Sequence, residues 1–148
     1  MIDKNHKNIA TFIHLSTFSK FLIPFGNFVG PIVLWVINKE KSNFIDRHGK
    51  QALNFQISVL LYTLILGMIT IPLVLFNIFS GFNFMDVDAF STIYMNYLKP
   101  SPLLYITGGF GLIAVIGFIL ELVFIVKASL AAKEGKYYKY PLTINFLK

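Results

Sequence analysis

The sequence predicts an all-α integral membrane protein, a four-helix bundle, and two observations support this class. Of its 148 residues 55% are hydrophobic and 16% aromatic, and the mean hydropathy is +0.66. A chain of this composition has too little polar surface to cover a soluble globule. The basic residues lie beside long apolar runs, as in proteins whose short cytoplasmic loops retain Lys and Arg. We interpret residues 1–148 as one transmembrane domain.

The first apolar region, Ile9 to Ile37, is intermediate between the roughly 20 residues of one helical crossing and the roughly 40 of two. Ile-Pro-Phe-Gly-Asn at 23–27 supplies turn-forming residues at its centre. We therefore expect a hairpin of two short helices, about 6–22 and 25–38, that crosses the membrane twice. One long tilted span with an external N-terminus, and an amphipathic first helix in the membrane interface, are the alternatives.

Two longer apolar runs are predicted to span the membrane. The helix 50–79 exceeds the roughly 30 Å hydrocarbon core at 1.5 Å per residue. Only Pro72 interrupts it, and we expect a kink there. The helix 103–133 follows two prolines that suit a helix start, and it ends before Gly135.

Charge predicts the orientation of these segments. The external loop is expected at 80–102, with a short interfacial helix at 90–98, because it carries Asp86 and Asp88 but only one lysine. The basic clusters should be cytoplasmic, which places both termini and the tail 134–148 on the cytoplasmic side of a bacterial inner membrane. These clusters are Lys4 and Lys7; Lys39, Lys41, Arg47 and Lys50; and Lys133, Lys136, Lys139 and Lys148.

Single cysteines can test this topology, because the chain contains none. Cysteines at Asn27 and Asn83 should be labelled from outside. Those at Asn5, Asn43 and Asn145 should be labelled from inside.

Several functional classes are disfavoured by the sequence. The absence of cysteine excludes disulfides, thiolate catalysis and Cys-ligated metals. No small-residue cleavage site follows the first apolar run, so a removable signal peptide is not expected. We assign the net charge of +6 to anionic lipid headgroups and expect no nucleic-acid binding. HExxH, GxSxG and Walker motifs are absent and the histidines are scattered, so we expect no enzyme activity, cofactor or metal.

Polar groups inside the apolar helices are the candidate functional residues. Glu121 precedes Lys127 by six residues and would place a carboxylate in the bilayer. An isolated charge there costs roughly 2.5 kcal/mol or more, so the group should be protonated, paired or beside a wet cavity. In the hairpin topology, polar groups of three helices lie roughly 10 Å inside the cytoplasmic boundary. The expected cluster, with a His14–Glu121 contact, is His14, Asn54, Ser58, Tyr62 and Glu121.

Small residues share the face of the last helix that carries Glu121, and such faces pack closely against other helices. The expected packing face is Ala114, Gly117, Ala128 and Ala132. Polar residues inside membranes usually hold helices together, at under about 1 kcal/mol each. A proton, ion or substrate pathway, and a contact to a partner subunit, are the alternatives for the polar cluster.

Several motifs resemble a known family. Asp-Arg-His-Gly-Lys-Gln-Ala-Leu-Asn-Phe-Gln at 46–56 is the most specific, and it is accompanied by His-Leu-Ser at 14–16, Pro-Ile-Val-Leu-Trp at 31–35 and Gly-Lys-Tyr-Tyr-Lys-Tyr-Pro-Leu-Thr-Ile at 135–144. Together they resemble small uncharacterised bacterial membrane proteins distantly related to the twenty-kilodalton subunit of the chloroplast inner-envelope protein translocon (Tic20-like proteins). The resemblance implies a four-helix multipass protein without an established activity. Its signature residues are Trp35, Asp46, His48, Gly49, Asn54, Gln56, Tyr140 and Pro141.

These signature residues have an expected structural role. Asp46 is expected to cap the first backbone N–H groups of the third helix, and His48 to lie at the headgroups with Arg47 and Lys50. The tyrosines of the tail should anchor it at the interface. The alternative is a cytoplasmic face that docks a partner.

The leading functional hypothesis is a non-enzymatic accessory or scaffold subunit of a membrane complex, for example in protein translocation or envelope assembly. The alternative is a small oligomeric ion or small-molecule transporter or channel that uses Glu121. An intramembrane enzyme would lack a visible nucleophile and base. The expected partners are the lipid bilayer and either a membrane protein or further copies of this chain.

Overall fold

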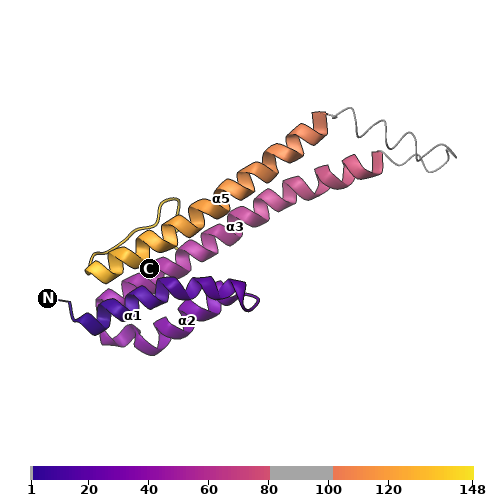
Figure 1. Ribbon diagram of the computed structural model, residues 1–148. Helices are drawn as coiled ribbons and strands as arrows, with labels where there is room; N and C mark the ends of the chain where they lie inside the picture. Colours follow the sequence, from indigo (N-terminus) through magenta and orange to yellow (C-terminus); the bar gives the residue numbers. More distant parts are fainter. Residues whose placement is uncertain (1, 81–101) are drawn as a thin grey trace. The chain divides into compact units, whose positions relative to one another are not determined.

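The computed structural model describes residues 2–80 and 102–148. The described residues form the helices α1 (Lys4–Leu15), α2 (Gly26–Asn38), α3 (Asn43–Ser80) and α5 (Pro102–Glu134), with 3-10 helices η1 (Ser16–Phe21) and η2 (Lys39–Lys41) (Figure 1). The predicted all-α class, with a hairpin followed by two long helices, is confirmed. The expected interfacial helix 90–98 lies outside the described residues, as does the loop 80–102 apart from its end residues.

The chain divides into two compact units. Unit 1 comprises Met1–Leu61 and Ile119–Lys148, and unit 2 comprises Tyr62–Phe118. Unit 1 therefore contains the α1–α2 hairpin, the first part of α3, the last part of α5 and the tail. Unit 2 contains the remaining parts of the two long helices.

Both long helices are long and apolar enough to span a membrane. The segments Asn43–Phe76 and Gly108–Glu134 reach mean hydropathies of 2.5 and 2.6, and α3 continues through Pro72. In the described part of unit 2 most large apolar side chains are exposed; Met68, for example, is 75% exposed. Exposure to water would cost about 25 cal/mol per Å² of such surface, whereas lipid imposes no such penalty. This surface is that of a membrane protein.

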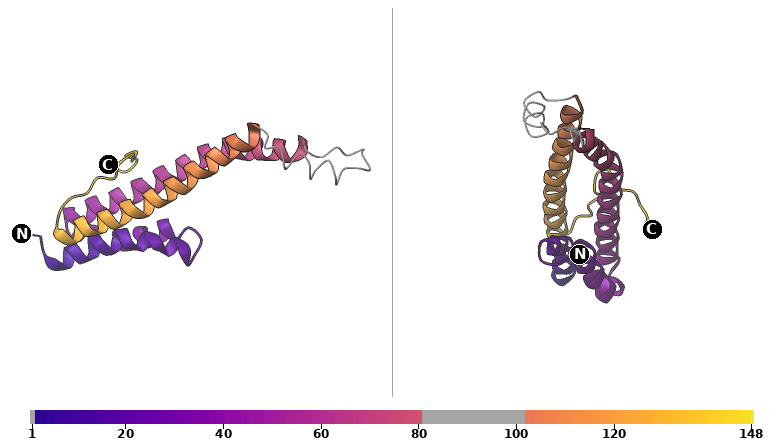
Figure 2. Two further views of the ribbon diagram at one scale, coloured as in Figure 1. Left: turned by 45° about the horizontal axis from the view of Figure 1, so that its top comes forward. Right: turned by 90° about the vertical axis from the view of Figure 1, so that its right-hand side faces the viewer.

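The hairpin in unit 1 is short. Its helices α1 and α2 lie side by side, and η1 extends α1 toward the turn at 22–25 (Figures 1 and 2). α2 has 13 residues and so a length of about 20 Å. The hydrocarbon core is roughly 30 Å thick. The turn is apolar and exposed, since Leu22 is 85% and Phe25 72% accessible.

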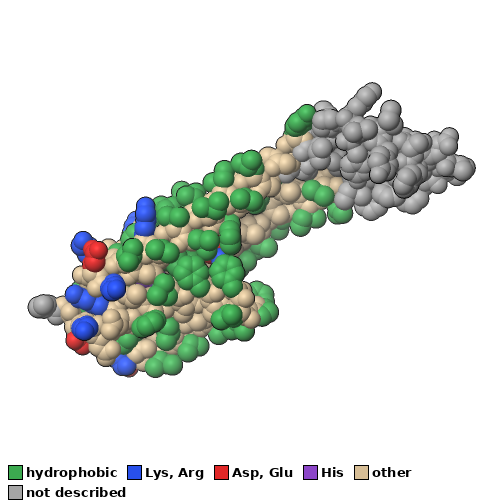
Figure 3. Space-filling model, in the orientation of Figure 1, with side chains coloured by type: hydrophobic (Ala, Val, Ile, Leu, Met, Phe, Trp, Pro, Cys, Tyr) green, Lys and Arg blue, Asp and Glu red, His purple; other side chains and the backbone are tan. Residues whose placement is uncertain are grey.

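The interior of unit 1 joins α1 and the start of α3 to the end of α5. Ala10, Phe44 and Ala132 form one buried cluster from these three places. Two further clusters are Ile13, Ile45 and Ala52, and Phe55, Ile125, Ala128 and Tyr140. Lys and Arg side chains gather over the end of unit 1 near the N-terminus, whereas hydrophobic side chains cover its helices elsewhere (Figure 3).

Two glycines shape this unit. A Cβ on Gly49 would overlap the Trp35 ring, so α3 packs against α2 only with glycine at this position. Gly135 (φ 82°) ends α5 in a Schellman motif, in which Gly135 N–H donates to the Ala132 carbonyl (3.0 Å) and Lys136 N–H to the Ala131 carbonyl (2.9 Å). The chain thereby turns back, and the tail runs along the helices of unit 1 (Figure 2).

Candidate functional site

A hydrogen-bond relay of three side chains lies in the interior of unit 1. It consists of Tyr140 from the tail, His14 from α1 and His48 from α3. Tyr140 Oη lies 2.9 Å from His14 Nδ1, and His14 Nε2 lies 2.8 Å from His48 Nδ1. All three side chains are at most 1% exposed. The ring of His48 thus connects helices inside unit 1, and its expected depth at the lipid headgroups stays a prediction.

The Tyr140 hydroxyl determines the direction of this relay. Burial, with smaller contributions from Tyr138 and Glu121, raises the pKa of Tyr140 well above its usual value, so the hydroxyl keeps its proton. If it donates to Nδ1 of a neutral His14, that ring must carry its proton on Nε2 and donate to His48 Nδ1. A neutral His48 then carries its proton on Nε2.

The opposite direction is less favourable. It would leave the Tyr140 proton without an acceptor and His48 Nε2 without a donor among the described residues. A buried polar group without a partner costs roughly 1–3 kcal/mol. The first direction leaves one unsatisfied group and the opposite direction leaves two. The relay therefore runs from Tyr140 through His14 and ends at the N–H of His48 Nε2.

Two polar residues of α3 hold the tail. Asn54 Oδ1 accepts hydrogen bonds from the N–H groups of Phe146 (3.1 Å) and Leu147 (2.8 Å), and Asn54 Nδ2 donates to the Leu147 carbonyl (3.0 Å). Ser58 Oγ accepts from Ile144 N–H (2.9 Å). These side chains satisfy backbone groups that an irregular segment cannot pair within itself. Both residues were predicted from the sequence as candidate functional residues, whereas the tail was not predicted as their partner.

Glu121 forms an ion pair with Lys20 of η1. Lys20 Nζ lies 2.6 Å from Glu121 Oε1, and the two side chains are 18% and 7% exposed. The expected His14–Glu121 contact is thus wrong, because Glu121 pairs with Lys20 while His14 belongs to the relay. Lys20 was not among the residues predicted from the sequence. A lysine inside an apolar run, away from the basic clusters, was the signal that could have revealed it.

Asp46 links α2 to α3. It accepts a hydrogen bond from Trp35 Nε1 (2.9 Å) and pairs with Lys50 (2.7 Å). The cap of α3 is instead Ser42, whose Oγ accepts the N–H of Ile45 at 3.2 Å. The expectation that Asp46 caps this helix is therefore wrong.

The other predicted residues fall in different environments. Gln56 is buried and accepts a hydrogen bond from Asn27 Nδ2 at 2.9 Å. Tyr62 is 43% exposed and is the first residue of unit 2. Of the remaining residues, Ala128 and Ala132 are buried, whereas Ala114, Gly117 and Pro141 are exposed. Within residues 2–80 and 102–148, no three His, Asp or Glu side chains are grouped so as to hold a metal ion.

The chain matches the model of a known protein family. The model of the MamF/MmsF family, described as the magnetosome magnetite crystal formation protein family, matches residues 5–147. The resemblance to Tic20-like proteins that we expected from the motifs at 46–56 and 135–144 is therefore wrong, because both motifs lie within the match to a different family. No curated protein and no solved structure matches the chain.

Proposed function

Because the chain belongs to the magnetosome magnetite crystal formation protein family, we propose that it is a magnetosome membrane protein that supports the formation of magnetite crystals. The match carries this proposal, since residues 5–147 include the hairpin, both long helices and nearly all of the tail. We propose a non-enzymatic role as an accessory or scaffold subunit. The use of the buried polar groups supports this role, because the relay, Asn54 and Ser58 all connect segments of unit 1.

The Lys20–Glu121 pair favours packing over transport. An intramembrane carboxylate that carries ions needs access to water or to the transported species. Glu121 instead has a side chain that is only 7% exposed and a lysine at 2.6 Å. The proposed role therefore places Glu121 in the interior of unit 1, where it holds α5 against η1.

Complementation tests the proposed function. The chain, with a fluorescent protein at its N-terminus, is expressed in a magnetite-forming bacterium from which its own members of this family have been deleted. We expect the fusion to co-localise with the crystals and the crystal size, measured by electron microscopy, to return toward that of the parent strain. An unrelated four-helix membrane protein is the control. Uniform fluorescence around the cell with unchanged crystals would contradict the proposal.

For the topology, we propose that both termini are cytoplasmic and that the hairpin enters and leaves the membrane by the same face. The buried cluster of Ala10, Phe44 and Ala132 supports the common location of the termini. The positive-inside rule makes that side cytoplasmic. The Asn27–Gln56 hydrogen bond supports a hairpin that stops short, because Gln56 lies about 20 Å along α3 from Asn43 and the core is roughly 30 Å thick. This arrangement replaces the two crossings expected from the sequence.

Cysteine labelling distinguishes the two arrangements. With a membrane-impermeant maleimide, cysteines at Asn5 and Asn145 should react only from the cytoplasmic side of sealed vesicles. A cysteine at Ile23, an exposed residue of the turn, should react from neither side until detergent is added, because lipid surrounds it. Reaction of position 23 from the opposite side would show that the hairpin crosses. Reaction of position 5 from that side would contradict cytoplasmic termini.

A further inference from the structure

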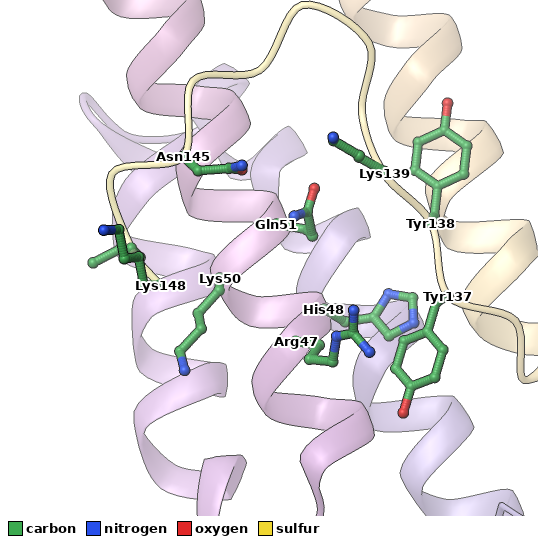
Figure 4. A pocket seen from close by; sticks show the side chains of 10 residues that line it. Arg47, His48, Lys50, Gln51, Tyr137, Tyr138, Lys139, Asn145 and Lys148 are labelled. Atoms are coloured by element: carbon green, nitrogen blue, oxygen red, sulfur yellow. The ribbon is translucent and has the colours of Figure 1, made fainter.

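A cavity of about 370 Å³ lies between the first turns of α3 and the tail of unit 1 (Figure 4). Its size falls at the lower end of the roughly 300–1,000 Å³ typical of small-molecule sites. Arg47, His48 and Gln51 line it from α3, whereas Tyr137, Tyr138, Lys139 and the last residues of the chain line it from the tail. The cavity exists only because the tail is docked on α3.

The lining is cationic. Arg47, Lys139 and Lys148 contribute three positive side chains, and none of the side chains that line the cavity is acidic. Lys50 also lines it but is paired with Asp46 at 2.7 Å. The Arg47 guanidinium lies 4.5 Å from the centroid of the Tyr137 ring, which orients its planar donors without neutralising their charge. An anion in the cavity would relieve the repulsion among these charges.

The wall also contains a buried donor that lacks an acceptor. The relay from Tyr140 ends at the N–H of His48 Nε2, and His48 lies in the wall between Arg47 and Tyr137 (Figure 4). Among the described residues this nitrogen has no hydrogen-bond partner, although the Lys136 backbone lies close enough to the ring to favour its protonated form. A buried donor of this kind is stabilised by an anionic oxygen.

Gln51 adds a second unsatisfied group to the wall. Its Oε1 is buried and has no hydrogen-bond partner in the part of the chain that the structure describes. An amide turned by 180° presents its NH₂ group at the same place, since the two ends of the group differ only in the atom assigned. Gln51 can thus donate to the same ligand as His48.

We propose that this cavity binds a phosphate ester, whose oxygens accept hydrogen bonds from Arg47, Lys139 and His48 Nε2. The volume accommodates a phosphate together with a small polar group such as glycerol. The cavity lies in the basic end of unit 1, and basic pockets on the cytoplasmic side of membrane proteins bind anionic lipid headgroups. A soluble phosphate ester offers the same chemistry. The proposal does not depend on a role in crystal formation.

Isothermal titration calorimetry on the full chain in an uncharged mild detergent tests the site. The probes are dihexanoyl phosphatidylglycerol and glycerol 3-phosphate, with dihexanoyl phosphatidylcholine as the zwitterionic comparison. We expect saturable binding of one ligand per chain. Binding of the phosphatidylglycerol alone identifies a lipid headgroup as the ligand, whereas equal binding of glycerol 3-phosphate identifies a soluble ester. Saturable binding of neither anionic probe, or equal binding of phosphatidylcholine, overturns the proposal.

Matched variants locate the binding. Arg47→Gln and Lys139→Gln should each weaken the affinity at least tenfold, and both side chains are exposed, so the fold is retained. Lys133→Gln is the control, because Lys133 is also exposed near the end of α5 but does not line the cavity. Its affinity should stay within twofold of the parent. An equal loss in all three variants would indicate diffuse surface charge and refute the site.

Discussion

Replacing Lys20 by methionine is expected to lower the free energy of unfolding by about 3–5 kcal/mol, because it leaves the Glu121 carboxylate in the interior without its partner. The carboxylate is 7% exposed and its Oε1 lies 2.6 Å from Lys20 Nζ. Methionine keeps most of the volume of lysine, so the loss reflects charge rather than a cavity. Unfolding is measured by circular dichroism in mild detergent during titration with sodium dodecyl sulfate.

The double variant Lys20→Met with Glu121→Leu completes the test. With both charges removed, no desolvated ion remains, and stability should return to that of the parent or exceed it by about 1–4 kcal/mol. Lys136→Ala is the control, since it removes the exposed pair that Lys136 forms with Glu134 and should have no measurable effect. If Lys20→Met alone were as stable as the parent, the pair would not hold α5 to η1.

The long helices could be predicted because each contains a long, predominantly apolar run, and length and hydropathy are local properties of the sequence. The third helix, expected from 50, nevertheless begins at Asn43. Of residues 43–49 only Phe44 and Ile45 are apolar, so no long apolar run marks this part of the helix. What starts the helix there is the Ser42 cap.

The partners of the buried polar residues could not be predicted in the same way. Depth in the membrane, estimated by counting residues, stays a prediction for His14 and Glu121, and the structure shows both side chains buried within unit 1. Which residue faces which depends on the rotation of each helix about its axis, which the sequence does not specify. His14 faces His48 on α3, whereas Glu121 faces Lys20 on η1.

The tail was the largest omission from the sequence-based interpretation. Residues after Gly135 have no helical periodicity, so they suggested a surface anchor. Asn54 and Ser58 give them backbone partners, and Tyr140 stacks on Phe55 at 4.1 Å between ring centroids. These contacts join residues that are far apart in the sequence, so no local sequence pattern predicts them.

The segment 46–56 connects every part of unit 1. Asp46 and Gly49 meet Trp35 of α2, and His48 meets His14 of α1. Farther along the segment, Gln56 accepts a hydrogen bond from Asn27, and Asn54 forms hydrogen bonds with the backbone of the tail. Packing within unit 1 therefore explains the unusual run of polar residues in this membrane helix. The N–H of His48 Nε2, at the end of the relay, is the group for which packing supplies no acceptor among the described residues.

Tyr140→Phe tests whether that relay is formed as we infer. The phenylalanine ring keeps the stacking on Phe55, but His14 Nδ1 loses its donor while remaining buried. We expect the free energy of unfolding to fall by about 1–3 kcal/mol. Tyr140→Ala also removes a large buried ring and should cost about 3–5 kcal/mol. Denaturant titration followed by circular dichroism measures both, and Tyr137→Phe, an exposed tyrosine of the same tail, should be unchanged.

Tyr140→Phe also tests whether the Tyr140 hydroxyl only packs the tail or also determines which nitrogen of His48 carries the proton. Without the Tyr140 hydroxyl, no donor holds the His14 proton on Nε2, so the His48 proton is no longer fixed on the nitrogen at the end of the relay. Phosphate-ester affinity should then fall in Tyr140→Phe by several-fold even where the protein is fully folded, although Tyr140 does not line the cavity. Unchanged affinity with reduced stability would mean that the hydroxyl only packs the tail. Unchanged stability would mean that the relay does not begin at Tyr140.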